Sequence, residues 1–176
     1  MSGEDLRPVY DPHTDIMNEV YLKQAYIYAS RSQDPSTQNG AILIHPEKGI
    51  VLGASNSLVE GSHDDVWSSE RKYHYVEHAE RNVLYKAARR GIPTVGLTLC
   101  CPWFACSDCA RAIVQCGIKK VIGHKKIYEF ASPRWKESVE IGLDILERAG
   151  VTCVFWEKDV GEGLFTIRVN GQEFSP

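Results

Sequence analysis

The amino-acid sequence predicts a three-layer α/β/α fold in which a mixed five-stranded sheet carries helices on both faces. Segments with helical and strand-like apolar patterns alternate in the order α-β-β-α-β-α-β-α-β, which is typical of an α/β protein. The first two strands are joined by a turn alone and form a hairpin, whereas a helix separates each later pair. A length of 176 residues, with 43% hydrophobic and 24% charged residues, fits one folded domain.

The first half of the chain contains one helix and the hairpin. Apolar residues recur at helical spacing in the opening segment, and β-branched residues mark the two strands that follow. The expected elements are a helix from Thr14 or Asp15 to about Ser32, a break at 34–37, strands at 40–44 and 50–55 around a turn at 45–49, and a polar irregular segment at 56–76, of a length that is often functional.

The second half alternates helices and strands, with glycine and proline at the helix ends. The expected elements are helices at 75–90, 107–116 and 133–149 and strands at 94–101, 121–122 and 151–156. The expected domain organisation is an N-terminal arm at 1–13, a domain at 14–157 and a polar C-terminal tail at 158–176, in which 164–169 is the one β-segment.

The composition favours a small ligand. A net charge of -3 argues against a broad basic surface for polynucleotides. The N-terminus has no apolar core of a secretory signal, and no apolar run approaches the roughly 20 residues of a membrane-spanning helix, so a cytoplasmic protein without membrane partners is expected. In that compartment the six cysteines are expected to be reduced.

Two short motifs carry the chemistry. His78-Ala79-Glu80 is followed by Cys106-Ser107-Asp108-Cys109, and the three residues His78, Cys106 and Cys109 can hold a zinc ion with its fourth tetrahedral position open. An open position is the mark of a catalytic zinc, and Glu80 would then be the general acid and base. His78 is placed in the first turn of one helix and the two cysteines around the start of the next, where the positive helix ends favour thiolate. An H-x-E followed by C-x-x-C is the known signature of zinc-dependent nucleobase deaminases.

Three other interpretations of these residues remain open. The C-x-x-C before a helix also fits a dithiol redox motif. Cys100 or Cys101 would complete a structural zinc site with four ligands, although both lie in an expected strand. His78, taken alone, is an ordinary histidine. Cys100, Cys116 and Cys153 lie in apolar runs and are interpreted as core residues, while Cys101 has no assigned role.

Most of residues 15–156 resembles the cytidine deaminase superfamily, and specifically its deoxycytidylate (dCMP) branch. The H-A-E and C-x-x-C motifs identify the superfamily, and two further segments point to the branch: Ser-Gln-Asp-Pro-Ser-Thr-Gln at 32–38, and Asp-Asp-Val at 64–66 with Lys-Tyr-His-Tyr-Val at 72–76. In one departure, Ala105 stands where the family usually has proline before the first zinc cysteine. The resemblance implies a cytidine-deaminase-like fold. It also implies these substrate contacts: Asn56 with the sugar hydroxyl, the Ala79 amide with the pyrimidine carbonyl, Tyr128 with the base or sugar, and Ser36 and Gln38 near the phosphate.

The reaction expected from this resemblance is hydrolytic deamination of dCMP, with one Zn2+ per chain. Zinc activates a water, and Glu80 takes its proton and passes it to the ring N3. Hydroxide adds at C4, and Glu80 then protonates the departing amine. The expected partners are a small nucleotide substrate and further copies of the chain in a homo-oligomer, without polynucleotide. The alternatives are a zinc deaminase of cytidine, guanine, a pterin or another free base or nucleoside, and a non-catalytic zinc or interaction module. Glu80 argues against the module, because a structural site has no use for it.

Overall fold

The computed structural model describes residues 12–130, 133–161, 163 and 165–176. Within these residues the central sheet has five strands in the order β2-β1-β5-β6-β7. Their bounds are β1 (Gly40–His45), β2 (Gly49–Ser55), β5 (Thr98–Cys100), β6 (Lys120–His124) and β7 (Thr152–Trp156). β1 pairs antiparallel with β2 and with β5, whereas β5, β6 and β7 are mutually parallel. The predicted mixed sheet and its antiparallel hairpin are confirmed.

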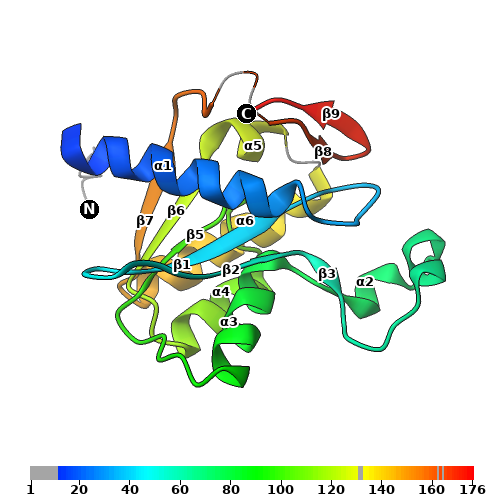
Figure 1. Ribbon diagram of the computed structural model, residues 1–176, viewed down its shortest axis with the longest axis horizontal. Helices are drawn as coiled ribbons and strands as arrows, with labels where there is room; N and C mark the ends of the chain where they lie inside the picture. Colours follow the sequence, from blue (N-terminus) through cyan, green and yellow to red (C-terminus); the bar gives the residue numbers. More distant parts are fainter. Residues whose placement is uncertain (1–11, 131–132, 162, 164) are drawn as a thin grey trace.

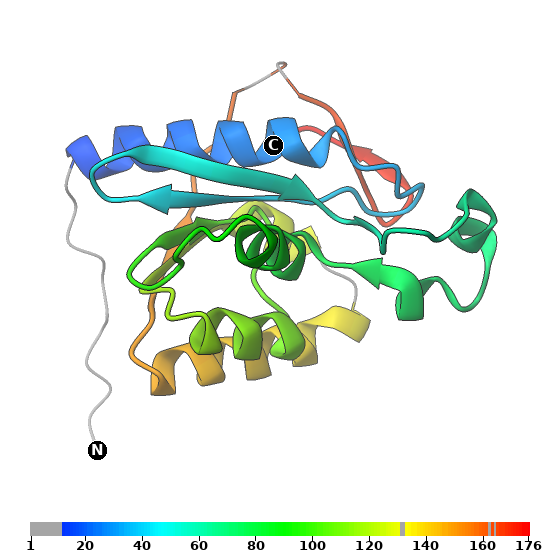
Figure 2. The same cartoon turned by 60° about the horizontal axis from the view of Figure 1, so that its bottom comes forward.

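Helices cover both faces of this sheet. α1 (Pro12–Ala29) lies on one face, and α3 (Ala79–Arg89), α4 (Ser107–Gln115) and α6 (Pro133–Arg148) lie on the other (Figures 1 and 2). Because both faces are covered, the neighbouring β1 residues Ile42 and Leu43, whose side chains point to opposite faces of the sheet, are both fully buried. The predicted α/β/α layering is therefore confirmed.

The close approach of α1 to β1 depends on a glycine. A Cβ atom added at Gly40 would collide with the backbone of Ala25 and Ala29 in α1. Gly40 is the first residue of β1 and directly follows the 34–39 loop. Its contact with α1 therefore fixes the position of the C-terminal end of this loop. No described helix is both long and apolar enough to cross a membrane.

One predicted helix is wrong in its first turn. The expected helix at 75–90 is divided into α2 (Lys72–Tyr75), β4 (Val76–Glu77) and α3. β4 pairs antiparallel with β3 (Ser57–Leu58), and these backbone hydrogen bonds hold residues 76–77 extended. A 3-10 helix, η1 (Asp64–Ser68), lies in the segment between them. A local helical pattern does not reveal this pairing, because β3 lies almost twenty residues earlier in the chain.

Both ends of the chain also differ from the prediction. Most of the expected N-terminal arm, residues 1–11, lies outside the described residues, and α1 begins at Pro12 instead of Thr14 or Asp15. In the C-terminal tail, the expected strand at 164–169 is shorter: β8 (Ile167–Val169) forms a hairpin with β9 (Gln172–Phe174), and Leu164 lies outside the described residues. A short helix, α5 (Lys125–Phe130), which the sequence did not predict, lies beside this hairpin (Figure 1).

Candidate active site

The three proposed metal ligands lie at the N-termini of two neighbouring helices. His78 is the N-cap of α3, Cys106 is the N-cap of α4, and Cys109 lies in the first turn of α4. The predicted position of His78 inside the first helical turn is therefore wrong by one residue, while the predicted positions of the two cysteines are confirmed. Each helix N-terminus carries partial positive charge, which favours thiolate at this point.

The spacing of these side chains fits a tetrahedral zinc ion. The Sγ atoms of Cys106 and Cys109 each lie 3.6 Å from His78 Nδ1, and the three donor atoms lie within 4.8 Å of one another. Zn–N bonds of about 2.0 Å and Zn–S bonds of about 2.3 Å at the tetrahedral angle would place nitrogen and sulfur about 3.5 Å apart, close to the distances in the structure. One nitrogen and two sulfur donors are also ligands that zinc prefers, so the residues present fit the metal.

The segment that carries Cys106 is held in place by α6. A Cβ atom added at Gly142 of α6 would collide with the Ala105 carbonyl oxygen, so this glycine lets the two backbones touch. The Cys109 thiol and then the His78 ring hydrogen-bond to Cys106, and together they lower the pKa of Cys106 to about 4. Arg81 adds positive charge, since its Nη1 lies 3.6 Å from Cys109 Sγ. The contacts therefore favour the ionised sulfur at Cys106, while the hydrogen bond with Cys106 and burial raise the pKa of the Cys109 thiol.

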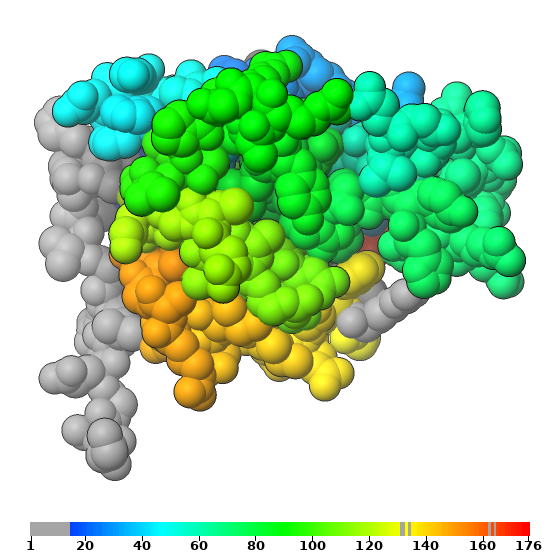
Figure 3. All heavy atoms as spheres, turned by 90° about the horizontal axis from the view of Figure 1, so that it is seen from below, coloured from blue at the N-terminus to red at the C-terminus, as the bar shows by residue number. Residues whose placement is uncertain are grey.

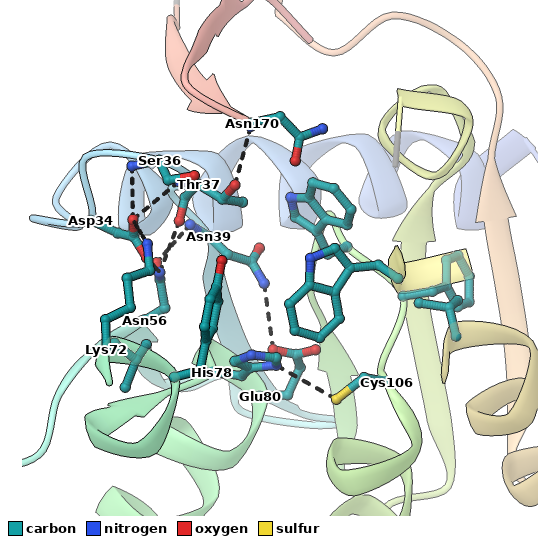
Figure 4. Close-up of a pocket in the computed structure, with 16 residues that line it drawn as sticks. Asp34, Ser36, Thr37, Asn39, Asn56, Lys72, His78, Glu80, Cys106 and Asn170 are labelled. Carbon is teal, nitrogen blue, oxygen red and sulfur yellow. Dashed lines mark hydrogen bonds and ion pairs between the residues drawn. The ribbon is translucent and has the colours of Figure 1, made fainter. Parts of the chain in front are cut away.

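Glu80 lies beside this cluster at the inner end of a cavity. Its side chain is almost completely buried, and burial raises the pKa of its carboxyl group above the usual value. A carboxyl group with a raised pKa is better matched to proton transfer near neutral pH. Figure 4 shows Glu80 next to His78 and Cys106, with its carboxylate facing the cavity.

Asn39 is a cavity residue that the sequence did not single out. Its Nδ2 lies 3.4 Å from Glu80 Oε2 and 3.2 Å from Cys101 Sγ, and its Oδ1 accepts a hydrogen bond from the Gly40 amide. Asn39 therefore joins the carboxylate to a thiol for which the sequence suggested no role. The sequence shows a polar residue directly before an apolar strand. Such a residue needs a hydrogen-bond partner if it is buried, but the sequence does not identify that partner.

The cavity itself is open on one side. The space between its walls, counted together with the open solvent at its mouth, is about 750 Å³. The space-filling view shows a gap between the blue-green segment at 60–75 and the yellow start of α6 (Figure 3). Residues from both sides of this gap, Lys72, Tyr73 and Trp135, line the cavity.

Aromatic side chains form part of the cavity wall. Trp103 and Phe104 come from the segment directly before Cys106. Trp135 from α6 packs edge-on against the His78 ring, with 5.5 Å between the ring centres. The indole Nε1 of Trp103 is buried and has no hydrogen-bond partner among the described residues. Flat apolar surfaces beside a metal cluster suit a heterocyclic base.

The loop at 34–39 forms the other side of the cavity and is organised by Asp34. Asp34 Oδ1 accepts hydrogen bonds from the amides of Ser36 (2.8 Å) and Thr37 (3.2 Å) and an ion pair from Lys72 Nζ (2.8 Å). Asp34 and Lys72 are both buried. Asn56 Nδ2 donates to the other oxygen of Asp34, and a buried carboxylate with four donors holds the loop in one conformation.

The residues expected to contact substrate are divided by the structure. Asn56 and Ser36 line the cavity, while Gln38 and Tyr128 are not among its lining residues. Gln38 instead bonds to the Ser32 carbonyl and the Arg168 amide. Tyr128 lies on α5, and its ring packs against Phe155.

Asn56 lines the cavity, whereas Ala79 lies between two lining residues and is not itself one of them. The Asn56 side chain already accepts from the Asn39 amide and donates to Asp34 and to the Thr37 carbonyl, so one lone pair of its Oδ1 remains. The Ala79 side chain is fully buried. Its backbone amide is the first of α3 and therefore has no acceptor within that helix.

One nitrogen and two sulfur donors would leave the fourth position on a zinc ion open, and a buried carboxyl group lies beside them. This arrangement is typical of the active site of a metal-dependent hydrolase. A sequence model of the cytidine and deoxycytidylate deaminase zinc-binding region matches residues 16–125. This match includes the three donors, Glu80 and the 34–39 loop. The chain belongs to this family of zinc-binding deaminases.

Individual relatives agree with the family match. The deoxycytidylate deaminase of Mus musculus is 33% identical over 144 residues, which is 76% of each chain. An uncharacterised deaminase from the luxG 3′ region of Aliivibrio fischeri is 31% identical over 80% of this chain and 93% of its own. Among solved structures, the dCMP deaminase of cyanophage S-TIM5 in complex with dCMP and dUMP is 26% identical with a TM-score of 0.63, covering 84% of this chain and 100% of that one. The predicted deaminase fold is confirmed.

Proposed function

We propose that this protein catalyses the hydrolytic deamination of dCMP to dUMP with release of ammonia, using one zinc ion per chain. The observation that carries the proposal is the buried Glu80 carboxylate facing the cavity beside His78, Cys106 and Cys109, whose N–S distances of 3.6 Å are those of a tetrahedral zinc site. Relatives that carry the name deoxycytidylate deaminase support the choice of substrate.

Zinc in a site with an open position acts as a Lewis acid that makes water nucleophilic near neutral pH. His78, Cys106 and Cys109 would hold it. Glu80 would accept one proton of the attacking water and deliver it to the ring N3 as the water oxygen bonds to C4. It would then take the second proton of that oxygen and pass it to the amine, so that the C4–N bond breaks and ammonia leaves. Because Glu80 is buried, this proton stays inside the cavity instead of being lost to solvent.

The shape of the cavity suggests how the nucleotide lies in it. The base would lie near the Trp103 and Phe104 side chains, with its carbonyl oxygen at the Ala79 amide. The sugar would then reach the free lone pair of Asn56 Oδ1. The phosphate would lie at the outer end, where Ser36 and Thr37 present hydroxyl groups and Lys72 an ammonium group. The ammonium group of Lys72 lies at the outer end, so the phosphate is placed there and not beside the carboxyl group of Glu80.

Polar groups at the outer end favour a nucleotide over a free base or pterin. The Lys72 ammonium and the Ser36 and Thr37 hydroxyls all line the cavity, and a free base would leave them without a ligand partner. A non-catalytic zinc module is disfavoured for another reason. Such a module gains nothing from a buried carboxyl group that faces an open cavity.

The proposal also includes a homo-oligomer working in the cytoplasm. Two cysteine ligands bind zinc as thiolates, and a reducing compartment protects thiolates from disulfide formation. Light scattering on the zinc-loaded protein measures the assembly directly. A monomer at micromolar concentration would contradict the oligomer and leave the chemistry unaffected.

The test of the proposed reaction is an ammonia-release screen of the zinc-loaded enzyme. The substrates are dCMP, 5-methyl-dCMP, deoxycytidine, dCTP, CMP, guanine and adenosine. We expect kcat/KM for dCMP to exceed that for deoxycytidine by at least about tenfold, the size of one hydrogen bond to a charged group. A nucleoside or a purine base as the best substrate would refute the assignment of dCMP.

A further inference from the structure

The C-terminal hairpin forms part of the wall of the active-site cavity. Its turn lies against the 34–39 loop (Figure 1), and four hydrogen bonds join them. They are Gln38 N to Arg168 O (2.8 Å), Arg168 N to Gln38 Oε1 (2.9 Å), Asn170 N to Thr37 Oγ1 (3.1 Å) and Gly171 N to Ser36 O (2.7 Å). Residues 158–176 lie outside the segment matched by the family model, so this contact is an addition to the matched region.

The hairpin is fixed by its own core contacts. Ile167, Val169 and Phe174 are buried in the hydrophobic core of the molecule. Phe174 also packs edge-on against Phe130 of α5, with ring centres 5.4 Å apart. A hairpin anchored in this way holds the residues of its turn at a defined place.

The turn presents Asn170 to the cavity. Asn170 and Gly171 join β8 to β9 with φ angles of 53° and 78°, which is the pattern of a two-residue type I′ turn. Asn170 lines the cavity together with Ser36 and Thr37. Figure 4 shows it at the end opposite Glu80 and Cys106.

The Asn170 side chain retains capacity to bind a ligand. Its Nδ2 donates to the Phe130 carbonyl oxygen at 3.2 Å, which uses one of its two N–H bonds. Thr37 Oγ1 accepts from the Asn170 backbone amide, which leaves the Thr37 hydroxyl proton free to be donated elsewhere. Together with Ser36, these groups form a set of donors at the cavity mouth. Phosphate oxygens accept hydrogen bonds and do not donate them when ionised, so they match this set.

We propose that Asn170 is a specificity-determining residue that recognises the 5′-phosphate of a nucleoside monophosphate, with the C-terminal hairpin as the wall that closes the phosphate end of the site. This inference rests on the proposed function, because it assigns an additional contact to the same substrate. Its alternative is structural: asparagine is a favoured residue for a positive φ angle in a type I′ turn.

The experiment separates these two roles by replacing Asn170 with residues that tolerate the turn. Asn170→Gly adopts positive φ without strain and keeps the backbone amide that bonds to Thr37, so only the side chain is lost. Asn170→Asp keeps the size and turn preference but adds a negative charge. Gln172→Ala, at an exposed position on β9, is the matched control. For each zinc-loaded variant, kcat and KM are measured for dCMP and for deoxycytidine, together with thermal stability.

We expect Asn170→Gly to lower kcat/KM for dCMP by roughly 10- to 100-fold through KM, the usual effect of losing a hydrogen bond to a charged group. The ratio of dCMP to deoxycytidine activity should fall by the same factor, and further in Asn170→Asp, because the aspartate repels the phosphate. Gln172→Ala should keep the wild-type ratio.

Two results would overturn the inference while leaving the proposed function in place. One is a dCMP-selective wild type whose selectivity is unchanged in Asn170→Gly. The other is an equal loss for dCMP and deoxycytidine in Asn170→Gly, which would show that the side chain serves only the structure. A wild-type enzyme that does not deaminate dCMP would overturn the proposed function itself, and the inference with it.

Discussion

The inner and outer ends of the cavity are built in different ways. At the inner end, His78, Cys106 and Cys109 lie at two helix N-termini that are packed against the sheet, and Glu80 follows in the first turn of α3. At the outer end, the 34–39 loop is held by side-chain hydrogen bonds to Asp34 and by the C-terminal hairpin. Regular secondary structure thus positions the reacting groups, while a polar network positions the groups proposed to recognise the substrate.

Catalysis and substrate recognition therefore have separate structural supports in this protein. A change at the inner end should abolish chemistry and leave the outer wall intact. A change at the outer end should weaken nucleotide binding and leave zinc in place. Substitutions at Cys109, Glu80, Asp34 and Asn39 test this separation, in decreasing order of expected effect.

Replacing a metal ligand should have the largest effect. In Cys109→Ala only two of the three protein donors remain, so we expect loss of both bound zinc and measurable turnover. Elemental analysis and ammonia release on the same preparation measure the two losses. Cys116→Ala, which removes a half-buried thiol outside the cluster, is the control and should keep both. Full zinc occupancy in Cys109→Ala would show that the donor set is a different one.

Replacing the proton carrier should separate chemistry from metal binding. Glu80→Gln keeps the size of the side chain but removes its ability to accept and return a proton. We expect turnover to fall by about 10²–10⁴, the usual contribution of general acid–base catalysis. Zinc content and thermal stability should stay near those of wild type, as they should in the surface control Glu60→Gln. Loss of zinc in Glu80→Gln would make the carboxylate part of the metal site.

Replacing Asp34 should affect the outer end alone. Asp34→Ala leaves the Lys72 ammonium without its carboxylate partner and the Ser36 and Thr37 amides without their acceptor. We expect the free energy of unfolding to fall by about 3–5 kcal/mol and KM for dCMP to rise about tenfold or more, with zinc retained. Asp34→Asn, which keeps an acceptor oxygen, should lose less. A KM equal to that of wild type would contradict the role of this loop in binding.

Replacing Asn39 should give the smallest effect. Asn39→Val removes the donor that lies 3.4 Å from Glu80 Oε2, a contact that holds one carboxylate oxygen in place. We expect kcat at saturating dCMP to fall about fivefold, corresponding to about 1 kcal/mol for one hydrogen bond. KM and zinc content should change little. If kcat is unchanged, Glu80 is held by its burial alone.

The sequence predicted the inner end of the cavity well because its residues are close together in the chain. His78 and Glu80 are two residues apart, and Cys106 and Cys109 are three apart, so a short motif describes each group. The β1–β2 hairpin was predicted for the same reason. The placement of His78 was one residue too far into the helix, because pairing of β4 with β3 ends the extended segment immediately before it.

The outer end was only partly predicted because its contacts are long-range. Ser36 was proposed from a family resemblance, whereas Asn39 and Asn170 were missed. Asn170 follows a short strand in a segment that was expected to be a polar tail, and no local pattern links it to Thr37. Gln38 and Tyr128 were expected at the substrate. In the structure Gln38 accepts a hydrogen bond from the Arg168 amide, and the Tyr128 ring packs against Phe155. Sequence position alone did not show which way these side chains face.

The contact between Thr37 and Asn170 joins residues that are 133 positions apart in the chain. During synthesis the N-terminal parts of a protein leave the ribosome first, and contacts of such separation form late. The metal ligands and Glu80 therefore emerge well before the hairpin that closes the outer wall. A nascent chain that has not yet reached the hairpin contains the reactive groups but lacks both the proposed phosphate wall and the core residues Ile167, Val169 and Phe174.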